Sequence, residues 1–158
     1  MGERRDRFPG RAGRRVVGLR RCESVPDAAF VTDTHPLLFF ASRDRRLSRR
    51  AAAHFAACEE RSALTYVPMA VLWECALLAR RGRIELRPSF RGFFEDLFSN
   101  PAYQPLDLTV EQIFLAEEAR PNNDPFDALI CAAARSLSLP LLTRDGEIEE
   151  SGLVRVVW

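Results

Sequence analysis

Residues 124–145 read DPFDALICAAARSLSLPLLTRD, and this stretch predicts a helix followed by a buried strand. Asp124 is a good helix N-cap, because its carboxylate can accept hydrogen bonds from the free amides of the first turn. The run PLLT is short and apolar, as in a strand covered on both faces, and it is followed by a second carboxylate, Asp145. The stretch therefore predicts one helix–strand unit of a parallel α/β sheet.

The rest of the chain after residue 27 alternates short apolar runs with longer helical stretches. This alternation predicts a three-layer α/β/α sandwich with a central, mainly parallel sheet. In the helical stretch 88–100, the side chains expected to face inward are Phe90, Phe93, Phe94 and Phe98. The expected strands are 28–33, 63–67, 103–108, 140–145 and 153–158, with 83–86 as a strand or an extended arm, and the expected helices are 47–62, 68–81, 88–100, 109–119 and 124–137.

The chain has 158 residues, which fits one domain, and every one of its 23 basic residues is arginine. Without lysine, a Walker A phosphate loop is excluded. Schiff-base enzymes and phosphotransfer sites that depend on a lysine are excluded as well. The four cysteines occur singly, which argues against a zinc knuckle and favours a reducing cytoplasm. No apolar run reaches the ~20 residues needed to cross a bilayer, so no membrane association is expected.

Residues 1–27 differ in charge from the rest of the chain. They carry eight arginines against four acidic residues, whereas the remainder carries fifteen against eighteen. We expect a basic, disordered extension at 1–27, with a nucleic-acid-binding arm as the alternative, and a catalytic domain at 28–158.

Carboxylates follow the predicted strands at several points. In an open parallel sheet, functional groups gather where the strands end, so these acids are expected to lie near one another. Clustered carboxylates raise one another's pKa unless a cation compensates them, and oxygen donors suit Mg²⁺ or Mn²⁺. Each acid also has an ordinary explanation as a turn residue, a helix cap or an ion-pair partner. The candidate set is Asp33, Glu74, Asp124, Asp127 and Asp145.

Five short motifs occur in a fixed order: VTDTHPLLFF, the WE within VPMAVLWECALL, GRIEL, DPFDALICAAAR and LLTRD. Through them, residues 28–158 resemble a PIN domain of the VapC toxin type. The resemblance implies a metal-dependent ribonuclease whose catalytic acids and Mg²⁺ or Mn²⁺ ligands are Asp33, Glu74, Asp127 and Asp145. Asp124 matches a frequent DPFD variant, and it either caps the helix or supports a ligand. The resemblance also implies a cognate antitoxin partner and a homodimer.

The chemistry of phosphodiester cleavage agrees with these roles, because bound divalent ions stabilise the charge that develops on phosphate oxygens. We expect Asp33 to be the central ligand, with Asp127 and Asp145 as direct or water-mediated ligands. Glu74 is expected to hold or orient the attacking water. Thr143 either hydrogen-bonds a neighbouring acid or is an ordinary strand residue.

RNA binding by this mildly acidic domain would need a local group of arginines to contact the phosphates. The arginines at 43–50 could form such a group, although an ordinary solvent-exposed helix face explains them nearly as well. His35 is left outside the catalytic set as a packing or capping residue. The alternatives to a toxin are a solitary RNA-processing nuclease and a catalytically silent PIN-like protein-binding module. The candidate RNA contacts are Arg43, Arg45, Arg46, Arg49, Arg50 and Arg144.

Overall fold

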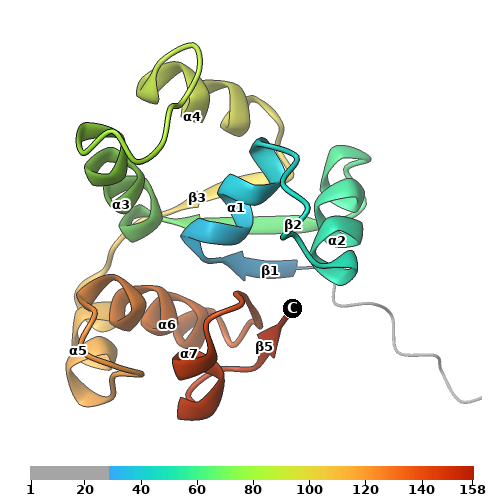
Figure 1. Ribbon diagram of the computed structural model, residues 1–158. Coiled ribbons are helices and arrows are strands. Elements are labelled where there is room, and N and C mark those ends of the chain that lie inside the picture. Colours follow the sequence, from blue (N-terminus) through green and yellow to red (C-terminus); the bar gives the residue numbers. More distant parts are fainter. Residues whose placement is uncertain (1–28) are drawn as a thin grey trace, which may run out of the picture.

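The computed structural model describes residues 29–158, so the expected extension at 1–27 lies outside the described residues (Figure 1). Among residues 29–158, no helix is long and apolar enough to cross a membrane. The elements, in chain order, are β1 Ala29–Thr32, α1 Thr34–Ala41, α2 Arg49–Glu59, β2 Leu64–Pro68, α3 Met69–Arg80, α4 Phe90–Ser99, β3 Tyr103–Leu106, α5 Val110–Glu118, α6 Pro125–Leu137, β4 Leu141–Leu142, α7 Gly146–Ser151 and β5 Val156–Val157.

The strands form one five-stranded sheet in the order β3-β2-β1-β4-β5, and every pair of neighbours is parallel. The predicted α/β class with a parallel sheet is therefore confirmed. From β1 the chain moves to β2 on one side of it, and it later reaches β4 on the other side. This reversal of strand order makes the carboxyl end of β1 a topological switch point, the usual place for a site in such sheets.

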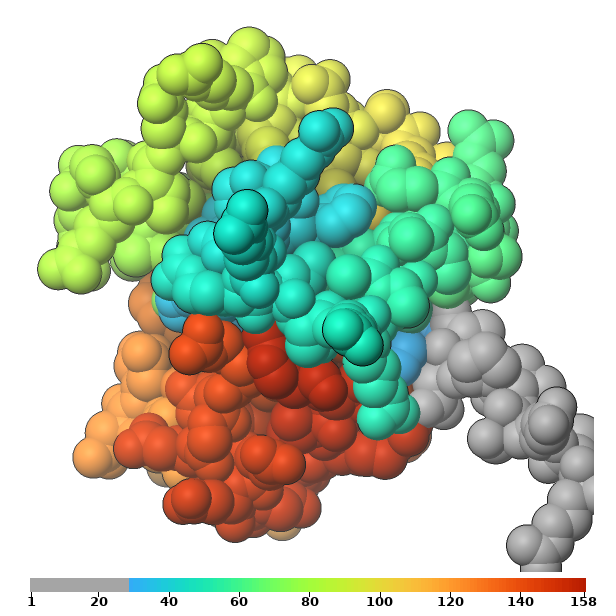
Figure 2. Space-filling view, turned by 45° about the vertical axis from the view of Figure 1, so that its right-hand side comes forward, coloured from blue at the N-terminus to red at the C-terminus, as the bar shows by residue number. Residues whose placement is uncertain are grey.

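Helices cover both faces of the sheet. The connection from β1 to β2 carries α1 and α2, and the connection from β3 back to β4 carries α5 and α6. Because parallel crossovers are right-handed and these two run in opposite directions, they lie on opposite faces. Figure 2 shows the α1–α2 region resting directly on the C-terminal third of the chain, which is far from it in sequence.

Local signals set the starts of two helices and the end of a third, as the sequence predicts. The Thr109 hydroxyl accepts from the Gln112 amide, and the Gln112 side chain accepts from the Thr109 amide, which is a capping box. Asp124 caps α6 through the Phe126 amide at 2.8 Å. After α3, Gly82 adopts a positive φ of 66°, which glycine reaches without a steric penalty.

The structure excludes one alternative and corrects two local expectations. Of the two alternatives for residues 83–86, no strand forms, and Ile84 and Leu86 pack against the core. Phe90 is exposed because it opens α4 at the edge of the core, whereas Phe94 is buried. The strand expected at 140–145 pairs only at Leu141–Leu142, and the six-residue helix α7 follows it.

Candidate active site

The site lies at the switch point, where β1 and β4 end side by side. Thr32 pairs with Leu142, and the Asp33 amide donates to the Leu142 carbonyl at 2.9 Å. This pairing brings the residues after the two strands together, although 110 positions separate Asp33 from Thr143. The end of β1 is thus where side chains from both halves of the chain can meet.

Asp33 is the most buried acid of the candidate set, with only 4% of its surface exposed. Its Oδ1 accepts from the Thr34 amide at 2.6 Å, which caps α1, and its Oδ2 accepts from the Thr143 hydroxyl at 2.7 Å. Burial raises the pKa of Asp33 above its ordinary value, and the two hydrogen bonds oppose that rise. Of the two alternatives for Thr143, the structure shows the hydrogen bond to a neighbouring acid.

Glu74 reaches the same region from α3. It is half-buried, and the Thr34 hydroxyl donates a hydrogen bond to its Oε2. Burial raises the pKa of Glu74, and the negative charge of Asp33 adds to the rise. Thr34 therefore joins two acids: its amide binds Asp33 and its hydroxyl binds Glu74.

Asp127 enters from the first turn of α6. Its Oδ2 accepts from the Asn122 side-chain amide at 2.8 Å. Burial raises the pKa of Asp127 to about 6, and the charges of Asp33, Asp124 and Asp145 contribute further. Asp127 also lines one hollow together with Asp124 and Asp145, so the three acids lie on the same side of the site.

Asp145 caps α7 by accepting from the amides of Glu147 and Ile148 at 2.8 and 3.1 Å. Its own amide donates to the Thr143 hydroxyl at 3.0 Å. Its negative charge raises the pKa of both Asp33 and Asp127. Asp145 is therefore tied by its backbone to the same threonine that binds Asp33.

The acids of the candidate set influence one another electrostatically, yet they do not form a ready coordination sphere. Within residues 29–158, no three or more His, Cys, Asp or Glu side chains lie close enough together to hold a metal ion. The side chains at the site are instead held separately by neutral donors, which limits their mutual repulsion. The chemistry of the candidate set still suits a hard divalent cation, because all its members are carboxylates and such cations prefer oxygen ligands.

Three polar residues at this site were not singled out from the sequence: Thr34, Asn122 and Glu147. Thr34 donates to Glu74, and Asn122 donates to both Asp127 and Glu147. These contacts depend on the tertiary fold. The only sequence signal is their position next to Asp33, Asp124 and Asp145, and small polar residues are common in such turns.

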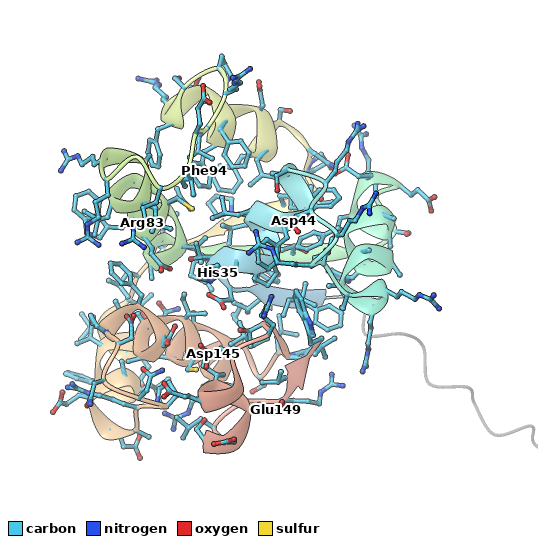
Figure 3. The ribbon with its side chains drawn as sticks, viewed as in Figure 1. His35, Asp44, Arg83, Phe94, Asp145 and Glu149 are labelled. Carbon is cyan, nitrogen blue, oxygen red and sulfur yellow. The ribbon has the colours of Figure 1, made fainter. Side chains whose placement is uncertain are left out.

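His35 is exposed at the start of α1, and its positive charge lowers the pKa of both Asp33 and Glu74. His35 and Asp145 are labelled at this end of the sheet in Figure 3. His35 does not cap α1, because Asp33 does, but its ring packs against the Phe39 ring with the centroids 6.0 Å apart, which agrees with the expectation of a packing residue.

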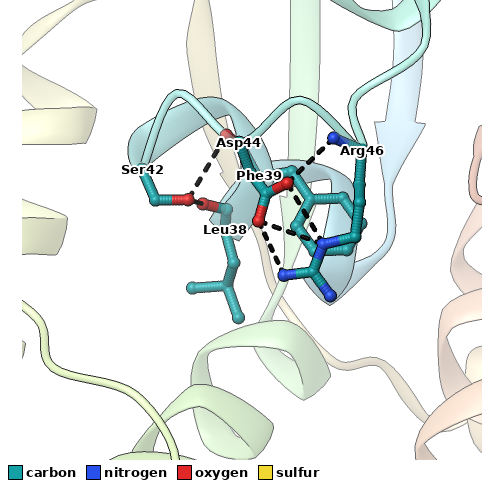
Figure 4. Close-up of polar contacts among 5 residues, drawn as sticks. All are labelled: Leu38, Phe39, Ser42, Asp44 and Arg46. Atoms are coloured by element: carbon teal, nitrogen blue, oxygen red, sulfur yellow. Dashed lines mark hydrogen bonds and ion pairs between the residues drawn. The ribbon is translucent and has the colours of Figure 1, made fainter.

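The arginines at 43–50 lie after α1 and at the start of α2. Arg46 is engaged: it pairs with Asp44 at 2.6 Å and lies 4.4 Å above the Phe39 ring (Figure 4). The charge of Arg144, on the loop after β4, also contributes to lowering the pKa of Asp44. The remaining members of the cluster are exposed and have no ion pair among the described residues: Arg43, Arg45, Arg49 and Arg50.

A parallel α/β sheet with acids gathered at its switch point, in a chain without lysine, defines a domain suited to hydrolysis at phosphate. Comparison with known proteins identifies the family. The family model described as "PIN domain" matches residues 30–152, and the chain belongs to this family. PIN domains are in general nucleases, and those nucleases typically use divalent metals.

Solved structures with similar folds come from toxin–antitoxin complexes. The structures of VapBC2 from Rickettsia felis bound to a promoter DNA fragment, FitAcB from Neisseria gonorrhoeae and a toxin–antitoxin complex from Klebsiella pneumoniae give TM-scores of 0.59, 0.56 and 0.55. Their identities to this chain are 12, 16 and 16%, over 82% of this chain and 97, 96 and 96% of theirs. At these identities the likeness shows the fold. The curated proteins yielded no match.

Proposed function

We propose that this chain is a Mg²⁺-dependent ribonuclease, also active with Mn²⁺, and the toxin of a toxin–antitoxin pair, with residues 28–158 as its nuclease domain. The observation that carries the proposal is the meeting of strand-end acids at the switch point. Asp33 lies at its centre, since Thr34 links it to Glu74 and Thr143 links it to the Asp145 amide. A bound divalent cation would polarise the phosphate and stabilise the charge that develops during cleavage.

The protein's own side chains have distinct parts in this proposal. Asp33, Asp127 and Asp145 would hold the cation, while Asp124 acts as the helix cap behind Asp127. Asp33 can keep both threonine hydrogen bonds while doing so, because an ionised carboxylate has about four acceptor positions. The positions of these oxygens are set before substrate arrives, which reduces the reorganisation needed in the reaction.

Glu74 would orient the attacking water. Its Oε2 is bound by Thr34, and its Oε1 has no hydrogen-bond donor among the described residues. The free oxygen can accept a proton from water as the water oxygen bonds to phosphorus and the ester bond to the leaving oxygen breaks. Burial raises the pKa of Glu74, which makes this carboxylate a stronger base than an exposed one.

RNA would be held through its phosphates by the exposed arginines around α2, with Arg144 on the loop after β4. Phosphate binding predicts a steep loss of affinity with added salt. Arg45→Ala with Arg49→Ala should weaken RNA binding and reduce the salt slope in a filter-binding assay. Arg91→Ala, an exposed arginine on α4 that pairs with Glu95, is the matched control and should leave the slope unchanged.

Two protein partners belong to the proposal. The similar folds found in toxin–antitoxin complexes support a cognate antitoxin. A homodimer is supported by the outer face of α5, where Val110 and Phe114 are 69 and 63% exposed and Ile113 lies beside them. Phe114→Arg should convert the dimer to a monomer in light scattering, whereas Phe90→Arg on α4 should not.

The cytoplasm remains the proposed compartment, because a reducing environment preserves the free buried thiols of Cys58, Cys75 and Cys131.

The decisive test is RNA cleavage with Mg²⁺ or Mn²⁺ by the full chain and by Asp33→Asn. The substitution keeps the size of the side chain and removes the charge that a cation needs. Asp107→Asn, an exposed acid after β3, is the matched control and should cleave normally. Cleavage that persists in EDTA, or an Asp33→Asn variant as active as the wild type, would contradict the proposal.

A further inference from the structure

Asn122 lies in the connection between α5 and α6 and uses both ends of its amide. Its Nδ2 donates to Asp127 Oδ2 and to Glu147 Oε2, each at 2.8 Å. Its Oδ1 accepts from the Asp124 amide at 2.8 Å. The amide therefore touches the helix that carries Asp127, the helix that Asp145 caps, and the backbone that precedes α6.

We propose that Asn122 is a positioning residue that sets the orientation of the Asp127 carboxylate for a divalent cation. This inference rests on the proposed function. The hydrogen bond occupies Oδ2 of Asp127, while Oδ1 has no donor among residues 29–158. Fixing one oxygen in this way orients the other, because the two oxygens of a carboxylate lie in one plane.

The second contact of Asn122 explains why an amide suits this position. Asp127 and Glu147 are both acidic, and a neutral group with two N–H donors can lie between them and bind both. An aspartate of the same shape has no N–H to donate and adds a negative charge. Two carboxylates sharing a site without such a donor would repel each other.

Asn122 also links the two elements whose acids must act together. Glu147 lies in the first turn of α7, and its amide donates to Asp145. Hydrogen bonds therefore connect Asp127 to Asn122, Asn122 to Glu147, and the Glu147 amide to Asp145, which caps α7. Loss of the amide should loosen the spacing between Asp127 and Asp145, and outer contacts of this kind commonly contribute 10–100-fold to metal affinity, as an order of magnitude.

Asn123 provides a matched control. It follows Asn122 in the chain, is exposed, and lines the same hollow of about 400 Å³ with Asp124, Asp127 and Asp145. The described residues give its side chain no hydrogen bond. A substitution there changes the same loop and the same hollow without touching the acids.

The test is calorimetric titration of Mn²⁺ into the full chain in the absence of RNA. Asn122→Ala should raise the dissociation constant about 10–100-fold, because it removes the donor to Asp127 without adding charge. Asn123→Ala should stay within about twofold of the wild type, as expected for a surface change that removes no contact. Asn122→Gln, which keeps the amide, should recover part of the affinity lost in Asn122→Ala. Circular dichroism of each metal-free variant checks that the fold is retained.

Equal Mn²⁺ affinity in wild type and Asn122→Ala would overturn the role of Asn122. An equal loss in the Asn123→Ala control would overturn it too, since the loop rather than the amide would then matter. RNA cleavage by the wild type separates this result from the broader proposal. If the wild type cleaves RNA with Mn²⁺ while Asn122→Ala binds Mn²⁺ normally, only the positioning role fails; if the wild type neither binds Mn²⁺ nor cleaves, both fail.

Discussion

The hydroxyl of Thr143 donates a 2.7 Å hydrogen bond to Oδ2 of Asp33, and it joins the ends of β4 and β1. Thr143→Val keeps the shape of the side chain but leaves a buried carboxylate oxygen without its donor. We expect a loss of about 1–3 kcal/mol in the free energy of unfolding at pH 7, measured with urea. Thr143→Ser retains the hydroxyl and should lose less, and equal losses in both variants would show that packing rather than the hydrogen bond is responsible.

Asp127→Asn should stabilise the metal-free protein while abolishing metal-dependent cleavage. Burial raises the pKa of Asp127 to about 6, so the folded state holds its proton more tightly than the unfolded state does. The associated stability is fully present below the unfolded pKa near 4 and is lost as pH rises through about 6. At pH 7 the neutral asparagine should therefore add about 1–2 kcal/mol, after a discount for solvent screening at this half-buried position.

The gain from Asp127→Asn should disappear at pH 3.5, where Asp127 is protonated in both states. Urea unfolding at pH 3.5 and pH 7 measures the difference, and Asp107→Asn is the exposed control. A gain of the same size at both pH values would show that the ionisation of Asp127 is not its cause.

Asp124→Ala should mainly weaken the start of α6. The carboxylate accepts from the Phe126 amide, and loss of such a cap costs about 0.5–2 kcal/mol. Asp124→Asn should retain most of the stability, because asparagine is also a good cap. Under the proposed roles, cleavage by Asp124→Ala should persist where cleavage by Asp127→Ala is lost. Equal loss of cleavage in both would show that Asp124 acts in cleavage in addition to capping α6.

His54 should make the fold less stable as the pH falls. Its Nε2 lies 2.9 Å from the Thr65 hydroxyl in the core, and burial lowers its pKa. The folded state then binds fewer protons than the unfolded state, so stability declines as pH falls below the ordinary histidine value of about 6.5. In urea unfolding, the advantage of wild type over His54→Gln should narrow between pH 7.5 and pH 5.5, and an advantage that stays constant would contradict this prediction.

The acids and helix caps could be predicted because their signals are local. A cap depends on residues within one helical turn, so Thr109 and Asp124 are recognisable from their neighbours in sequence. Short apolar runs likewise indicate strands, although the run at 83–86 packs against the core without pairing, because nothing in its composition specifies a pairing partner.

The sequence by itself determined the α/β class, the acidic character of the site and the absence of any lysine chemistry. Only the tertiary structure decided which groups hold those acids: Thr34 between Asp33 and Glu74, and Asn122 between Asp127 and Glu147. The physical reason is that strand order sets these contacts. With β4 paired beside β1, segments separated by most of the chain share one edge of the sheet, and no local pattern of residues encodes that pairing.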